Sequence, residues 1–207
     1  MKTISQIELN MLIERHNKYL KSLMDSKKRG ERLLLDEIDF TCNNLSDLNF
    51  ADIYITSSYF CSQIFENKNM GDAKLYSCIF ENIIFENCNF GKTILDYARI
   101  VNSKFINCNL VELETLETSF EGVLFRNCTF NGAFSDCVIK NATFEDCIIA
   151  STEFWKCSIE SLKVSNKTNQ WELKKFIREI NIGTITTPQY IKDSEAIEYF
   201  EKQCDIV

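Results

Sequence analysis

Cysteine is the residue type whose spacing in this chain first suggests chemistry. Four of the ten cysteines, Cys88, Cys108, Cys128 and Cys147, recur at intervals of 20 or 19 residues. Zinc needs thiolates that converge on a tetrahedron, and a disulfide needs Cβ atoms that face each other. Thiols stacked on successive turns of a coil point in parallel instead. We therefore expect small, buried, structural thiols and no metal or cofactor, while the sequence leaves open whether any two of them form a disulfide.

The other candidate groups also lack chemical partners. His16 is the only histidine, and no nucleophile that it could activate accompanies it in the sequence. No phosphate-binding loop, metal-ligand spacing or triad signature is present. We predict no catalytic, cofactor-binding or metal-binding residues, and we expect that the protein is not an enzyme. One polar residue per 20 also recurs, and stacked side-chain amides can form a hydrogen-bonded ladder that stabilises a corner: Asn67, Asn87, Asn107, Asn127 and Asp146.

These spacings reflect an internal repeat, which decides the fold. Similar segments begin at Phe65, Phe85, Phe105, Phe125 and Phe144, and a shorter period of five runs inside them. All 14 phenylalanines between positions 35 and 164 lie at the centres of these pentads. The centres are Leu35, Phe40, Leu45, Phe50, Ile55, Phe60, Phe65, Met70, Leu75, Phe80, Phe85, Phe90, Leu95, Ile100, Phe105, Leu110, Thr115, Phe120, Phe125, Phe130, Phe134, Ile139, Phe144, Ile149, Phe154, Ile159 and Val164.

A period of five fits neither an α-helix nor an alternating strand. It fits a coil with four sides, one pentad per side, in which each centre and the residue two before it point inward. Residues 20 apart then stack, about 4.8 Å from each other. Two ladders are predicted, each on its own face of the coil: Leu45, Phe65, Phe85, Phe105, Phe125, Phe144 and Val164 on one, and Phe40, Phe60, Phe80, Ile100, Phe120, Ile139 and Ile159 on a second.

The pentads resemble those of the pentapeptide-repeat protein family. The resemblance covers residues 33–164, and residues 30–35 are similar to the family's first coil. Residues 13–20 resemble the short helix that often precedes it, with Tyr19 at a frequent tryptophan position and His16 at the position of the capping-helix histidine. The resemblance implies an all-β solenoid, a right-handed quadrilateral β-helix with α-helical caps at both ends.

Two irregularities interrupt the repeat. Thr115 occupies a centre, so we expect a local bulge where Leu113 or Leu116 points inward instead. Only four residues separate Phe130 from Phe134, and that side should be short and bent around Gly132. Both features are compatible with tolerated drift of the repeat or with a recognition feature.

We expect three parts: an N-terminal helical cap at 1–32, the β-helix at 33–164 and a C-terminal helical segment at 165–207. A helix over residues 4–24 should cover the first coil. Trp171–Ile180 and Ser194–Gln203 should also be helical, the second capped by Ser194 or Asp193. The apolar residues of the C-terminal segment exceed what one coil end can bury, so we expect a homodimer through it. The helix over 4–24 should bury Ile4, Ile7, Met11, Leu12, Tyr19, Leu20 and Leu23.

Charge narrows the class of partner. Residues 36–160 contain 19 acids and 8 bases, a balance of −11, whereas the flanking segments are +4 and neutral. An acidic coil argues against direct binding of nucleic acid. The N-terminus does not resemble a signal peptide and no membrane span is predicted, so a cytoplasmic location is expected. We expect a non-enzymatic protein-interaction protein with an unknown partner. The alternative is an acidic DNA mimic that binds and protects DNA gyrase, because the acidic coil and the passage 164–180 resemble the quinolone-resistance branch of the family.

Overall fold

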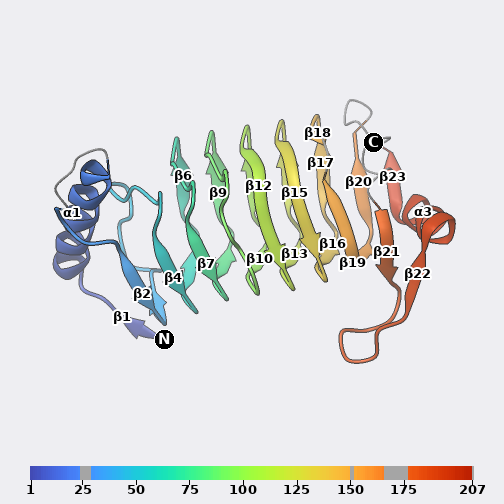
Figure 1. Cartoon of the computed structure of the whole chain (residues 1–207), viewed down its shortest axis with the longest axis horizontal. Helices are drawn as coiled ribbons and strands as arrows, with labels where there is room; N and C mark the ends of the chain where they lie inside the picture. Colours follow the sequence, from blue (N-terminus) through green and yellow to red (C-terminus); the bar gives the residue numbers. More distant parts are fainter. Residues whose placement is uncertain (24–28, 150–151, 166–176, 207) are drawn as a thin grey trace.

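The computed structural model of the chain describes residues 1–23, 29–149, 152–165 and 177–206. Short strands lie side by side along one long axis, with α1 at one end and α3 at the other (Figure 1). The N-terminal elements and first coils comprise β1 Lys2–Thr3, α1 Gln6–Ser22, β2 Leu34–Asp36, β3 Ile38–Asp39, β4 Tyr54–Thr56, β5 Tyr59–Cys61, β6 Ile64–Glu66, β7 Lys74–Tyr76, β8 Ile79–Glu81 and β9 Ile84–Glu86. The middle coils comprise β10 Arg99–Val101, β11 Lys104–Ile106, β12 Asn109–Leu116, β13 Ser119–Glu121, β14 Leu124–Arg126, β15 Thr129–Ser135, β16 Val138–Lys140, β17 Thr143–Glu145 and β18 Ile148–Ile149. The C-terminal end comprises β19 Glu153–Glu160, β20 Leu162–Val164, β21 Ile177–Asn181, β22 Tyr190–Lys192, α3 Asp193–Gln203 and β23 Cys204–Ile206.

The register of the coil follows the 20-residue period. Phe65 pairs with Phe85, Phe85 with Phe105 and Phe105 with Phe125, all in parallel strands. The adjacent face pairs in the same way, from Phe60 through to Ile159. The chain is a β-solenoid, and both predicted ladders are confirmed wherever these strand pairs extend.

The core is the row of pentad centres inside the coil. All 14 phenylalanines at centres are at most 3% exposed. Along one ladder the rings stack, with centroids 4.8 Å apart between Phe85 and Phe105 and 5.0 Å apart between Phe105 and Phe125. Burial of one such side chain is worth about 1.5–3 kcal/mol, so the ladder supplies the stabilisation that a thin coil needs.

The corners of the coil depend on a backbone conformation that the repeat also encodes. The residue two after a centre commonly has a positive φ, for example 54° at Asn67 and 53° at Asn127. Asparagine and aspartate adopt this left-handed region more readily than other non-glycine residues. Their recurrence at this position therefore sets the turn between two sides of the coil.

The two irregularities form one local feature. β12 and β15 shift register between Val111 and Glu114, where Glu112 and Leu113 lie opposite the single residue Gly132. The expected bulge is confirmed. Leu113 and Thr115 are both buried, so the large and small inward residues have exchanged places within one pentad, and Thr115 is not displaced from the interior.

The N-terminal helix covers the first coil with a different face from the predicted one. Leu9, Ile13 and His16 are buried, whereas Ile7 and Met11 are exposed, as is Leu23 after the helix. The prediction was wrong for Ile7, Met11 and Leu23, because the helix is held to the coil through the side that carries His16, whose ring makes two hydrogen bonds to the coil. The first residues add β1 to the sheet beside β3, which the sequence did not predict.

The C-terminal end differs from the prediction in one element. Ile177–Asn181 is the strand β21, which pairs with β19, and not the end of a helix; residues 171–176 of that predicted helix lie outside the described residues. The second predicted helix is present as α3, but its N-cap is Lys192, without a side-chain hydrogen bond. Together β21, β23 and α3 cover the last coil.

This arrangement also buries some of the apolar residues of the C-terminal segment, whose excess was the reason to expect a dimer. Ile177, Ile180 and Phe200 are buried within one chain, while Ile185 and Tyr190 remain exposed. Dimerisation stays a prediction. No helix within the described residues is long and apolar enough to cross a membrane.

Candidate binding surface

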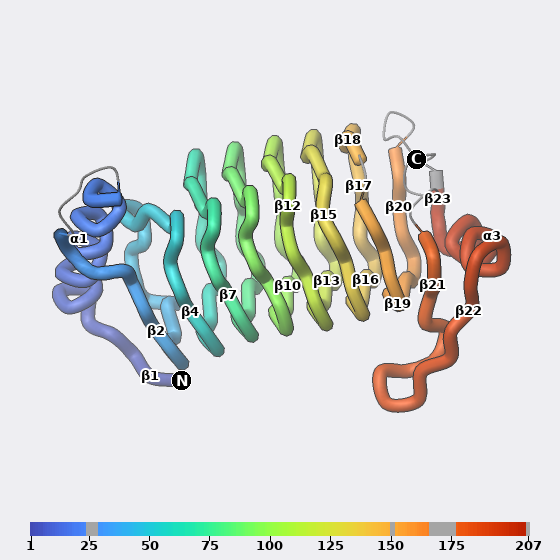
Figure 2. The backbone as a smooth tube through the Cα atoms, in the orientation of Figure 1, coloured from blue at the N-terminus to red at the C-terminus, as the bar shows by residue number. Residues whose placement is uncertain are grey.

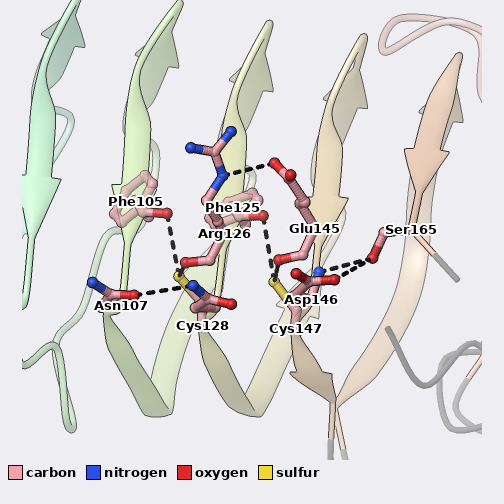
Figure 3. A network of polar contacts seen from close by, with 10 residues as sticks. Phe105, Asn107, Phe125, Arg126, Cys128, Glu145, Asp146, Cys147 and Ser165 are labelled. Carbon is pink, nitrogen blue, oxygen red and sulfur yellow. Dashed lines mark hydrogen bonds and ion pairs between the residues drawn. The ribbon is translucent and has the colours of Figure 1, made fainter. Parts of the chain in front are cut away.

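The recurrent cysteines donate hydrogen bonds to the backbone inside the coil. The thiol of Cys108 lies 3.4 Å from the carbonyl oxygen of Phe85. The thiol of Cys128 lies 3.3 Å from the carbonyl oxygen of Phe105 (Figure 3). Thr93 makes the same contact to Met70 at 2.6 Å. Cysteine, serine and threonine at this inward position therefore combine a small side chain with a donor, whereas Ala73, Ala98 and Ala142 supply the small volume alone.

The pKa shifts of the buried thiols differ in direction: hydrogen bonds with Cys128 and Cys88 lower the pKa of Cys108, and Cys137 and Cys147 also have lowered pKa values. Burial raises the pKa of Cys78 to about 12 and raises the pKa of Cys157 well above its usual value. All ten cysteines belong to the described part of the chain, and all are thiols and not disulfides. Across the described ranges, no group of three or more His, Cys, Asp or Glu side chains is arranged to hold a metal ion.

The asparagines form two polar ladders on the outside of the coil. The predicted ladder is present where Asn127 donates to Asn107 and Asn107 to Asn87, at 3.3 and 3.2 Å. A second ladder joins Asn109, Asn89 and Asn69. In this second ladder each side-chain oxygen also accepts from the backbone N–H two residues later. Both ladders therefore stabilise the turns of the coil, and a ligand would have to break these bonds to use the amides.

His16 fastens the N-terminal helix to the first coil. Its Nε2 atom donates to the carbonyl of Ala51 at 3.0 Å, and its Nδ1 atom accepts the N–H of Leu33 at 3.1 Å. Both bonds together require the neutral ring, and burial lowers the pKa of His16. Nearby, the Asp52 carboxylate accepts from the hydroxyl of Tyr19 and pairs with Arg32 at 2.8 Å. The histidine is therefore structural.

Charge gathers on one side of the coil, which we call the acidic face. It is one side of the coil, and its segments follow one another in register from coil to coil. The first four segments are β2, β4, β7 and residues 94–97. The last three are the second half of β12 with the corner residue Glu117, the second half of β15 with the corner residue Asp136, and the first half of β19 through Lys156. Burial raises the pKa of Asp96 within it. Its outward positions carry two bases, Lys74 and Lys156, and seven acids: Asp36, Glu37, Asp96, Glu114, Glu117, Asp136 and Glu153.

A shallow depression lies at one edge of the acidic face. It has a volume of about 320 Å³ and its lining includes Glu112, Glu114, Glu153 and Gly132. The pentad around Gly132 is one residue short, so the backbone there lies close to the bulge at Leu113 on the preceding coil. The irregularity of the repeat therefore shapes the acidic surface at this point.

A groove lies at the opposite corner of the same face. There β19 continues around the corner to Glu160, whereas β21 leaves the coil at Asn181. The loop 182–189 between β21 and β22, which we call the tongue, projects beyond the edge of the coils (Figure 2). The tongue and the last three coils enclose a groove of about 370 Å³, lined by Glu117, Ser119, Asp136, Cys137, Val138, Lys156, Ser158, Asn181, Ile185, Pro188 and Tyr190.

The fold and these surfaces define the class of protein: a capped β-solenoid with five residues to a side and a charged exterior. Residues 78–154 match the family model described as "Pentapeptide repeat region". Together with the repeat that runs from Leu35 to Val164, this match shows that the chain belongs to the pentapeptide-repeat proteins.

Two solved structures are similar to the chain at low identity. HetL, a pentapeptide-repeat protein involved in heterocyst differentiation regulation in the cyanobacterium Nostoc sp. strain PCC 7120, is 15% identical with a TM-score of 0.40, over 70% of this chain and 68% of that chain. QnrB1, a plasmid-mediated fluoroquinolone resistance protein, is 14% identical with a TM-score of 0.34, over 68% of this chain and 86% of that chain. The search of curated proteins found no match.

The sequence analysis missed both the acidic face and the groove. The acidic face could have been found by sorting the charges by their side of the coil, since every twentieth residue falls on one column. The groove could not, because it depends on where β21 leaves the coil.

Proposed function

We propose that this chain is a non-enzymatic binding protein whose acidic face engages a positively charged surface of a protein partner. The observation that carries the proposal is the uneven distribution of charge, with seven acids and two bases on one face of the coil. The face is also rigid, because the stacked core and the pairing of its strands from coil to coil hold its backbone. A preformed charged surface loses little conformational entropy on binding and speeds the encounter with an oppositely charged partner.

The proposal is tested by neutralising charge on one face at a time. The chain is immobilised, proteins from the source cell are captured over a series of salt concentrations, and the bound proteins are identified by mass spectrometry. We expect the double variant Glu114→Gln, Glu153→Gln to lose a partner that the native chain retains at moderate salt. The matched control Glu66→Gln, Glu86→Gln removes the same charge from the opposite face and should retain it. Equal retention by both double variants would contradict the proposal.

DNA gyrase or another topoisomerase is a second candidate partner, supported by the net charge of −11 over residues 36–160. Such a protein would accept the acidic coil in place of DNA. The coil has a lower charge density than duplex DNA, which weighs against this candidate. Over a coil length of about 30 Å there is one net charge per roughly 3 Å, compared with about 1.7 Å for duplex DNA.

The two candidates differ in a competition experiment. If the coil replaces DNA, it should inhibit DNA binding by purified gyrase, and added DNA should release it. A gyrase that binds DNA equally well with and without an excess of the chain would exclude this second candidate and leave the first unaffected.

A further inference from the structure

We infer that the groove between the tongue and the coil binds an extended, cationic peptide segment that carries an apolar side chain. The inference rests on the proposed function and extends it, because it places a specific contact of the partner at the corner of the acidic face. Four observations lead to it: a fixed wall, carboxylates without partners, exposed apolar side chains and a regular floor.

The tongue is a fixed wall. Asn181 is nearly buried, and its side-chain oxygen accepts the N–H groups of Gly183 and Gln189 at 2.9 and 3.0 Å. A bond from Ile182 N–H to the carbonyl of Gln189 and another from Thr184 N–H to that of Thr187 close the loop. A loop held from within presents the same surface before and after binding, which reduces the entropic cost of binding.

The base of the tongue is fastened to the coil through Lys156. The ammonium group lies 4.5 Å from the ring centroid of Trp155 and 5.5 Å from that of Tyr190. The indole N–H of Trp155 donates to Glu179 on β21 at 3.2 Å. The lysine at this corner is therefore engaged with aromatic rings, and its position in the groove is set.

Glu117 and Asp136 supply the charge of the groove. They lie in one corner column with Lys156, one residue on each of three successive coils, and both have a positive φ. Their side chains form no hydrogen bond or ion pair with any residue in the described part of the chain. Two unpaired carboxylates at the edge of an apolar groove favour a cationic occupant.

The apolar part of the groove comes from the tongue. Ile185 is 81% exposed although hydrogen bonds within the loop hold its backbone, and Pro188 and Tyr190 line the same groove. A group of exposed apolar side chains that borders a groove commonly marks a binding site. The occupant therefore needs an apolar side chain beside its positive charge.

The floor favours an extended segment. Ser119, Val138 and Ser158 follow one another in register on three successive coils, so the floor repeats about every 4.8 Å along the axis. An extended peptide alternates its side chains on two sides and rises about 3.3 Å per residue. Such a peptide, laid along the axis, can direct cationic side chains toward Glu117 and Asp136 and apolar ones toward Ile185.

The test uses the full chain and a short fluorescein-labelled peptide in which lysine and valine alternate, with binding followed by fluorescence anisotropy. We expect the double variant Glu117→Gln, Asp136→Asn to weaken binding about three- to tenfold, as expected for two exposed charges. Ile185→Ser should weaken it by a similar factor. Both changes lie at exposed or corner positions that tolerate the new residue, so the melting temperature should not move.

Matched variants serve as controls. Glu66→Gln with Glu86→Gln removes the same charge from the opposite face, and Ile64→Ser removes an exposed isoleucine there. Both should bind the lysine–valine peptide as the native chain does. Peptides with glutamate in place of lysine, or serine in place of valine, should bind the native chain at least several-fold more weakly.

Several outcomes would overturn the inference. If Glu114→Gln with Glu153→Gln weakens binding while the groove variants do not, the acidic face binds cations but the groove is not the site. If no acidic variant changes binding, both the groove and the proposed function fail. Equal binding of the glutamate or the serine peptide would exclude the stated chemistry. Light scattering that shows a dimer dissociated by Ile185→Ser would assign the groove to a second copy of the chain.

Discussion

Where the residue two before a centre is cysteine, serine or threonine, it has two roles at once. It fills the space that the large centres leave inside the coil, and its donor satisfies a backbone carbonyl on the preceding coil, as Cys108 does for Phe85 and Thr118 does for Leu95. An unsatisfied buried carbonyl costs about 1–3 kcal/mol. The choice among cysteine, serine and threonine therefore varies, whereas the pairing of small volume with a donor recurs.

This predicts a graded response at Cys108. Cys108→Ser keeps a donor and should lower the free energy of unfolding by less than the Cys108→Ala change, which we expect to cost about 1–2 kcal/mol. Urea denaturation followed by circular dichroism measures both. A chelator such as EDTA should leave the native midpoint unchanged, and a midpoint that falls in EDTA would show that the thiols hold a metal.

His16 makes a pH-dependent attachment for α1. Burial lowers its pKa in the folded chain, so the unfolded chain takes up the proton first as the pH falls below about 6.5. Stability contributed by the neutral ring is therefore present above that pH and lost below it, with a slope of at most about 1.4 kcal/mol per pH unit. Thermal melts from about pH 7.5 to about pH 5.5 should show this loss in the native chain. His16→Gln should be less stable at the higher pH and show a flatter profile, and a profile as steep as that of the native chain would assign the loss to another group.

At the scale of elements, the coil is tolerant of one lost residue because the neighbouring strand bulges to match it. The match demands a glycine. A Cβ atom at Gly132 would lie 2.4 Å from the backbone carbonyl oxygen of Leu113. At Gly91 the nearest atom to a Cβ would be the side-chain oxygen of Asn89, at 3.3 Å, and the nearest backbone atom would lie at 3.8 Å, an ordinary contact distance.

Gly132→Ala should therefore destabilise the chain by about 1–3 kcal/mol through overpacking, while Gly91→Ala should change stability by only a few tenths. Chemical denaturation compares the two directly. Equal effects of the two substitutions would mean that the bulge can move away from Gly132.

Periodicity predicted the coil well because the same packing recurs at one pentad centre after another. A single exception such as Thr115 therefore leaves the register recognisable. The ends lack this redundancy. The apolar residues of α1 form two strips, and the polar contacts of the helix to the coil, those of His16 to Ala51 and Leu33 and that of Tyr19 to Asp52, accompany the strip that faces the coil. Residues 177–180 fit a helical pattern as well as a strand, and the free edge of β19 decides for the strand.

At the scale of the whole molecule, the same limit applies to the candidate site. The charges of the acidic face are fixed by the repeat and follow from the sequence, but the groove arises where two distant segments, the corner at Glu117 and the tongue at Ile185, meet. A site formed by two segments that are distant in the sequence cannot be predicted from a local sequence pattern. The coil itself is one continuous core from Leu9 to Phe200.

Continuity of the core makes the coil depend on every part of it. Phe105 lies in the middle of its ladder, between Phe85 and Phe125, and is 1% exposed. Phe105→Asp removes a packed ring, at a cost of about 3–5 kcal/mol, and buries an unpaired carboxyl group, at a further cost of several kcal/mol. The sum approaches or exceeds the total stability of a typical domain, about 5–15 kcal/mol. Neither half of the divided coil has a cap at the new end, so we expect the whole chain to lose its far-UV dichroism and cooperative melting, while Phe105→Leu retains both at a lower midpoint. A Phe105→Asp variant that kept the native dichroism and midpoint would show that Phe105 does not point into the coil.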